Sequence, residues 1–137
     1  MDMSTAFQNL NWLAIVLSSV SAFLLGFVWY SLLFPKAWMR ENGFTEESNK
    51  NSNMLKIFGL SFLFMLFAAF NLAMFIGKGQ GVAGGAMAGF LAGLGWVFTF
   101  IGVTYMFEKK SFTLLFINGG YSVVSLTLMG IIIGLMQ

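Results

Sequence analysis

Residues 82–107 read VAGGAMAGFLAGLGWVFTFIGVTYMF and contain no charged side chain. A bilayer hydrocarbon core of ~30 Å needs about 20 apolar residues of helix to cross it. The stretch is therefore long enough, and apolar enough, to predict a membrane-spanning helix. Consecutive apolar runs such as Phe62 to Phe67 lack the alternation typical of membrane β-barrel strands, so helices are the expected form of all the spans.

Three further stretches have the same character. They cover residues 11–34, 55–76 and 112–136, and their only charge is Lys56, at the edge of the second, where it can reach the interface. Hydrophobic residues make up 58% of the 137 and charged residues only 9%, against roughly 25% charged in soluble domains. No Lys or Arg precedes Lys36, so we expect a retained first span rather than a signal peptide. The fold class predicted is an all-α, integral membrane four-helix bundle in a single domain, residues 1–137.

The connections between spans are short except for the first. Residues 35–53 form the one sizeable polar loop, in which Pro35 suits the first turn of an interfacial helix and Gly43 suits its end. Residues 77–81 and 108–111 read as turns. Every basic residue except Lys78 lies in or beside the first and third loops, which the positive-inside rule places in the cytoplasm. Both termini are then expected on the extracytoplasmic side.

The residues that are missing exclude several classes of function. The chain has no Cys and no His, which removes disulfides, thiol chemistry, imidazole catalysis and the usual zinc or haem ligands, and we expect no cofactor. No Asp, Glu, Lys or Arg lies in the middle of a span. Small multidrug transporters, which also have four spans, depend on a carboxylate inside the first helix, so proton-coupled antiport of that type is disfavoured.

Glycines recur every four residues in the third span, and two more follow at the same spacing in the fourth. Small residues so spaced allow helix backbones to approach closely, which drives association in lipid. The contact could lie inside one protomer, or it could form a homo-oligomer interface or line a pore. The residues are Gly81, Gly85, Gly89, Gly93, Gly130 and Gly134.

Apart from Lys56, the polar residues within the spans are uncharged, and most are serines and threonines. Asn71, Thr99 and Asn118 could join helices to one another or line a weakly polar path, and we expect Asn71 and Asn118 to point inward because an amide is costly in lipid. At the end of the first span, aromatic and basic residues gather at the predicted cytoplasmic boundary: Trp29, Tyr30, Lys36, Trp38 and Arg40. They are typical of an anchoring belt, or of a site for an anionic lipid headgroup or small anion.

Glu108 is the one acidic residue of the third loop and directly precedes Lys109 and Lys110. Pairing with these neighbours competes with a longer contact to Lys36 or Arg40, which lie at the same predicted membrane face. We take the longer contact as a hypothesis that would tie the end of the third span to the first loop.

Two runs carry a family resemblance. The first is Gly26…Trp29-Tyr30-Ser31…Leu33-Phe34…Lys36-Ala37-Trp38-Met39, after the start Asn11-Trp12; the second is Tyr105…Phe107-Glu108…Lys110, then Ile117…Gly120-Tyr121…Met129-Gly130…Ile132. Together they resemble the domain of unknown function seventeen-sixty-one family of small bacterial membrane proteins, over nearly the whole chain. The chain departs from that pattern at Leu32 and Pro35, where many members carry Pro and Gly. The resemblance implies four spans in a bacterial inner membrane, and it brings no established activity or site residues.

Three classes of function remain. The favoured one is a non-enzymatic membrane protein that acts through oligomeric assembly, as a scaffold, accessory subunit or lipid-organising protein. Its expected partners are the lipid bilayer, copies of itself and anionic headgroups, and not nucleic acid. The second is a passive channel or facilitator for a small neutral or weakly polar solute. The third, an interfacial enzyme, would have to use Glu108, Glu41, Tyr30 or Lys36, and no span offers paired carboxylates or an activated nucleophile.

Overall fold

The computed structural model describes residues 2–50 and 52–137, and all the regular structure in these residues is helical. Two of the elements, named η, are π-helical turns that continue the α-helices before them. In chain order the elements are α1 (Met3–Gln8), α2 (Trp12–Phe27), η1 (Val28–Leu33), α3 (Pro35–Asn42), α4 (Glu46–Lys50), α5 (Met54–Phe75), α6 (Gly81–Ala92), η2 (Gly93–Phe98), α7 (Thr99–Phe107) and α8 (Phe112–Met136).

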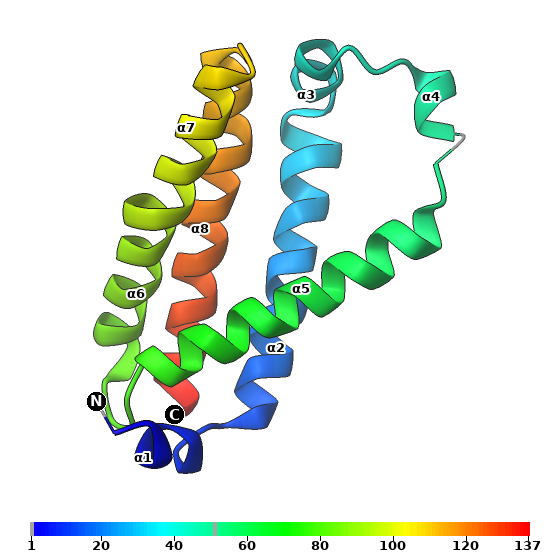
Figure 1. Cartoon of the computed structure of the whole chain (residues 1–137). Helices are drawn as coiled ribbons and strands as arrows, with labels where there is room; N and C mark the ends of the chain where they lie inside the picture. The colour runs from blue at the N-terminus through cyan, green and yellow to red at the C-terminus, as the bar shows by residue number, and fades with distance from the viewer. Residues whose placement is uncertain (1, 51) are drawn as a thin grey trace.

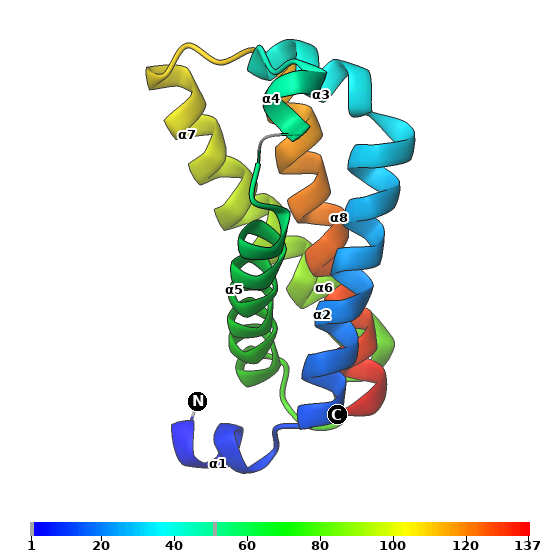
Figure 2. The same cartoon turned by 90° about the vertical axis from the view of Figure 1, so that its right-hand side faces the viewer.

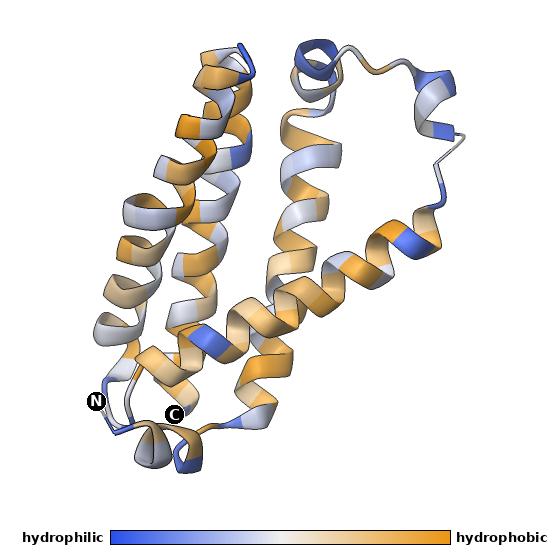
Figure 3. Cartoon of the chain, in the orientation of Figure 1, coloured by the Kyte–Doolittle hydropathy of each residue, from blue (hydrophilic) through white to orange (hydrophobic). Residues whose placement is uncertain are grey.

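Within the described residues, four helices are long enough and apolar enough to cross a membrane, and they occupy the four stretches predicted from the sequence. They cover Trp12–Leu33, Met54–Phe75, Gly81–Phe107 and Phe112–Met136. Figure 3 shows their apolar colour, with hydrophilic residues gathered mainly at the two ends of the molecule. The N- and C-termini lie at the same end, and α3, α4 and the α7–α8 turn lie at the other (Figures 1 and 2).

Polar side chains at the boundaries start three of the four long helices. The side-chain oxygens of Asn11, Asn53 and Ser111 accept hydrogen bonds from backbone N–H groups three residues later, at 3.0–3.1 Å. Each cap satisfies one of the donors that a helix start leaves free, which matters most where lipid offers no partner. The short helix predicted after the first span is confirmed as α3: it begins at Pro35, and Gly43, which follows its last residue, has a φ of 71° in the left-handed region.

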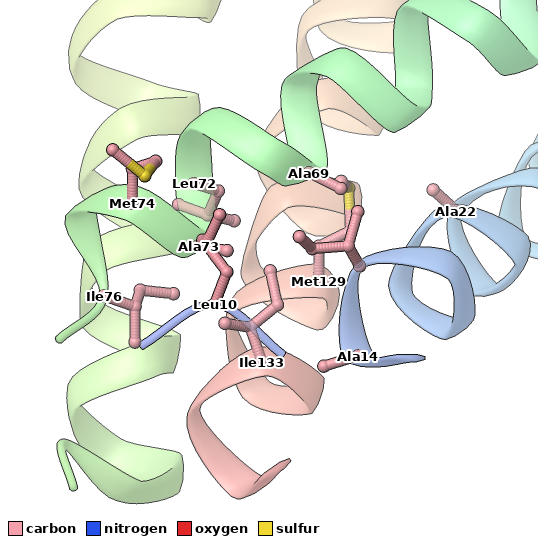
Figure 4. Packing of buried hydrophobic residues seen from close by; sticks show 11 residues of the cluster. Leu10, Ala14, Ala22, Ala69, Leu72, Ala73, Met74, Ile76, Met129 and Ile133 are labelled. Atoms are coloured by element: carbon pink, nitrogen blue, oxygen red, sulfur yellow. The ribbon is translucent and has the colours of Figure 1, made fainter. Parts of the chain in front are cut away.

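Helix α8 is the centre of the molecule, with α2 on one side and α6 and α7 on the other (Figure 1). The core lies at the end that carries the termini, where α2, α5 and α8 meet. Figure 4 shows this cluster, in which Ala14, Ala69, Met129 and Ile133 are completely buried. The side chain of Gln137 joins the same three helices, because it donates to the carbonyls of Ala73 and Ile76 and accepts from the N–H of Asn11.

The glycines of α6 lie directly against the backbone of α8. A Cβ added to Gly85 would collide with the carbonyl oxygen of Gly130, and one added to Gly89 would collide with that of Leu126. Gly134 meets the backbone of Gly81 in the same way, and a Cβ on Gly93 would lie 2.7 Å from the Cα of Val123. These contacts are inside one protomer. Glycine is required here because no side chain fits between two backbones in van der Waals contact.

The π-turn η2 sets which residues of the third span face α8. Gly85, Gly89 and Gly93 face α8 at steps of four residues, whereas Phe98, which packs against Gly119 of α8, follows Gly93 by five residues. The ring of Phe98 fills the space left by Gly119. A four-residue step keeps side chains on one face of an α-helix, so the extra residue in η2 is what lets α6 and α7 present a single face to α8.

Helix α5 leans away from the rest of the molecule (Figure 1). Its last two turns enter the core, while its first half, including Leu55, Phe58 and Phe64, is exposed. Between α2 and α5 lies a groove of about 560 Å³ lined only by apolar and aromatic residues: Trp12, Ile15, Val16, Leu63, Leu66, Phe67 and Phe70.

Candidate functional site

Two of the three tyrosines of the chain bond to one asparagine of α8, and the third tyrosine packs against one of them. Tyr30 donates its hydroxyl hydrogen bond to Oδ1 of Asn118 at 2.7 Å, and Nδ2 of Asn118 donates to the hydroxyl of Tyr105 at 2.7 Å. The ring of Tyr121 lies edge-on to that of Tyr30, with 5.3 Å between centroids. We call Tyr30, Tyr105, Asn118 and Tyr121 the tyrosine–asparagine cluster. It joins the first, third and fourth spans.

The π-turn η1 brings two adjacent side chains of the first span onto α8. Tyr30 reaches Asn118, and the indole Nε1 of its neighbour Trp29 donates to the carbonyl of Ile117 at 2.8 Å. The turn closes where the N–H of Phe34 donates to the carbonyl of Trp29, five residues back. π-turns occur mostly as single turns within α-helices and often at functional sites. In this chain the π-turn places two aromatic donors on one partner helix.

A glycine makes space for an aromatic ring at two points beside the cluster. A Cβ on Gly120 would lie 3.3 Å from the ring of Trp29, and one on Gly26 would lie 3.2 Å from the hydroxyl of Tyr121. That hydroxyl donates to the carbonyl of Ala22 at 2.7 Å. Within the described part of the chain, every buried side-chain nitrogen and oxygen has a hydrogen-bond partner. The cluster is thus a satisfied network of neutral groups, which favours fixing the three spans over proton transfer.

The basic residues beside the cluster point elsewhere. Lys36 and Arg40 are exposed and, together with the end of η1, line a groove of about 400 Å³. Trp38, on the same helix, is half-buried and packs between the rings of Tyr30 and Phe44, at centroid distances of 5.9 and 5.3 Å. The predicted belt therefore divides into aromatic residues that pack inward and cations that face outward.

The hypothesis of a long ion pair from Glu108 is wrong for this structure. Glu108 is exposed at the end of α7, and in residues 2–50 and 52–137 the one ion pair is Arg40 with Glu41, at 3.5 Å. The end of α7 leans away from α3 (Figure 2), which separates the two ends that the hypothesis would join. The predicted ionic tie between the third span and the first loop is absent, and the neutral bonds of Asn118 join the first and third spans instead.

The three polar residues that could have lined one path do not lie together. Asn118 points inward as predicted. The prediction for Asn71 is wrong, because Asn71 is exposed and its Nδ2 donates to the carbonyl of Phe67 on its own helix at 2.8 Å. Thr99 is also exposed and donates to the carbonyls of Gly95 and Trp96. Asn118 therefore bonds to other spans inside the protomer, whereas Asn71 and Thr99 lie on its surface.

Comparison with known protein families gives one match. The family described as "Protein of unknown function (DUF1761)" matches residues 13–134. The chain belongs to the DUF1761 family. The match spans nearly all of the four long helices and includes the tyrosine–asparagine cluster, Lys36 and Arg40, and it confirms the resemblance seen in the sequence. Searches of curated proteins and of solved structures gave no match.

Proposed function

We propose that this DUF1761 protein is a non-enzymatic, multi-pass protein of the bacterial inner membrane that acts by associating with copies of itself. The observation that carries the proposal is the position of Asn71. Its amide lies inside a span and faces away from the protomer, bonded only to its own helix among the described residues. A polar amide left against hydrocarbon costs free energy, and hydrogen bonds between helices relieve that cost.

Asn71 belongs to a larger surface with the features of a helix–helix interface. Phe75, one turn after Asn71 on the same side of α5, packs edge-on against Trp96, with 6.2 Å between ring centroids. On η2, a Cβ at Gly95 would meet nothing within 4 Å, and Thr99 follows one turn later. We define the outward face as five exposed residues: Asn71, Phe75, Gly95, Trp96 and Thr99. Small and polar residues are those enriched where membrane helices associate.

The orientation that we propose places both termini outside the cytoplasm. The termini share one end of the molecule, with Lys78 in the α5–α6 turn, while α3 and the α7–α8 turn carry Lys36, Arg40, Lys109 and Lys110 at the other. Basic loops are retained in the cytoplasm. We infer the lack of catalysis from the chain's chemistry, since it has neither His nor Cys, and the tyrosine–asparagine cluster contains no carboxylate or amine.

Two glycine substitutions provide a matched test of self-association. Gly95 and Gly59 both have open space for a side chain, but only Gly95 belongs to the outward face. The protein would be reconstituted in liposomes at several protein densities, and its stoichiometry counted by single-molecule photobleaching. We expect Gly95→Leu to shift the population toward monomers and Gly59→Leu to leave it unchanged.

Asn71→Leu tests the same surface through its polar group. Hydrogen bonds between model membrane helices are worth about 1–2 kcal/mol, so we expect the dissociation constant to rise about five- to thirtyfold. A wild-type protein that stays monomeric at every density would contradict the proposal. So would a loss of association in Gly59→Leu equal to that in Gly95→Leu.

A further inference from the structure

The groove at the junction of η1 and α3 combines an apolar wall with a basic rim. Leu32 and Leu33 form part of the wall, and 63% and 57% of their surfaces are exposed. Lys36 and Arg40 form the rim; because they are four residues apart on α3, they lie on one face of the helix. The groove encloses about 400 Å³ and is open to the surroundings of the protein.

The groove also lies at the end of the first apolar span. Leu32 and Leu33 are the last residues of the first apolar span, and α3 starts two residues after it, at Pro35. The wall therefore continues the lipid-facing surface of the span, while the rim begins where that surface ends. A molecule that filled the groove would meet leucines at its apolar end and two cations at its polar end.

We propose that this groove binds an anionic phospholipid, with the headgroup phosphate between Lys36 and Arg40 and the first part of an acyl chain along Leu32 and Leu33. Charge complementarity supports an anion. The one ion pair of Arg40, to Glu41, is 3.5 Å long, and the Arg40 side chain is 69% exposed, so most of the five guanidinium donors remain available. The apolar wall supports a lipid, since a free inorganic anion gains nothing from exposed leucines.

This site is separate from the outward face and does not depend on self-association. It also agrees with the orientation proposed above, because basic residues on the cytoplasmic side of a span attract anionic lipid. The ligand is defined by its chemistry: a singly charged phosphodiester attached to a diacylglycerol, as in phosphatidylglycerol.

Native mass spectrometry of the detergent-solubilised full chain, titrated with phosphatidylglycerol or phosphatidylcholine, tests the proposal. We expect tighter binding of phosphatidylglycerol by the wild type. Lys36→Gln combined with Arg40→Gln should weaken it about 25-fold, at about fivefold for each basic residue. The matched control is Lys109→Gln combined with Lys110→Gln. It removes the same charge at the same end of the molecule from residues that do not line the groove, and should change binding less than twofold.

Three results would overturn the proposal. Equal affinity for the two lipids would exclude a site for anionic lipid. Equal weakening in the two double variants would assign the preference to the overall charge of that end of the molecule rather than to the groove. Competition by glycerol 3-phosphate at the same concentration as phosphatidylglycerol would show a site for a soluble anion that makes no use of the leucine wall. Circular dichroism melting of each variant separates loss of binding from loss of fold.

Discussion

Gly89→Ala should destabilise the protein, although alanine is the better helix former. The added Cβ would collide with the carbonyl oxygen of Leu126, and a backbone atom cannot rotate away as a side chain can. Helices α6 and α8 must therefore separate, and overpacking of this kind costs about 1–3 kcal/mol. We expect the free-energy cost of this clash to lie near the upper end of that range, at about 2–3 kcal/mol. The gain of about 1 kcal/mol from replacing glycine in a helix offsets part of it.

Gly59→Ala is the matched control, because a Cβ at Gly59 meets nothing within 4 Å. It keeps the propensity gain of about 0.5–1 kcal/mol and carries no clash. The apparent free energy of unfolding, measured by SDS titration in mixed micelles, should thus fall by about 1–2 kcal/mol in Gly89→Ala and rise slightly in Gly59→Ala. If the two variants were equally stable, the close backbone contact of α6 with α8 would be refuted.

Two further predictions concern the tyrosine–asparagine cluster and the orientation. Asn118→Leu removes the partner of two tyrosine hydroxyls and should lower the free energy of unfolding by about 1–2 kcal/mol. Asn71→Leu should leave the stability of the monomer within about 0.5 kcal/mol. The same micelle titration compares the two variants, and equal losses would contradict a role of the cluster in holding the spans together. In intact cells, Lys78→Cys should react with an impermeant thiol reagent and Lys50→Cys should not, with no native cysteine to interfere; the opposite labelling would reverse the proposed orientation.

The long helices follow from the sequence because length and apolar composition decide whether a segment can span a membrane. A close helix contact inside one protomer was one of the alternatives that the glycine spacing left open, and the structure assigns it to α6 and α8. The two asparagines show where such reasoning stops. Asn71 and Asn118 both stand in helices whose apolar residues are spread around the whole circumference, so hydrophobic periodicity does not define the rotation of either helix about its axis. Which asparagine turns inward depends on packing.

The tilt of a helix and a local change in its hydrogen-bonding pattern also cannot be predicted from amino-acid composition. The ion pair expected of Glu108 required the ends of α7 and α3 to meet, and only the tilt of α7 decides that. The π-turn η1 differs from an α-helix in its backbone hydrogen bonds and not in the types of residue that form it. The bonds of Trp29 and Tyr30 to α8 were therefore not predicted from the sequence. The closest signal in the sequence was the cluster of aromatic residues at the end of the first span, which was interpreted as an anchoring belt or a site for a headgroup or small anion.

Because of the five-residue step in η2, a one-residue deletion should be tolerated better at η2 than elsewhere in the third span. A chain one residue shorter between Gly93 and Phe98 could close that step as ordinary α-helix and still present both flanking segments to α8. One residue removed from α6 would instead turn everything on one side of the deletion by about 100° relative to the other, since an α-helix has about 3.6 residues per turn. Related chains whose third spans differ by one residue are therefore expected to place the gap at η2.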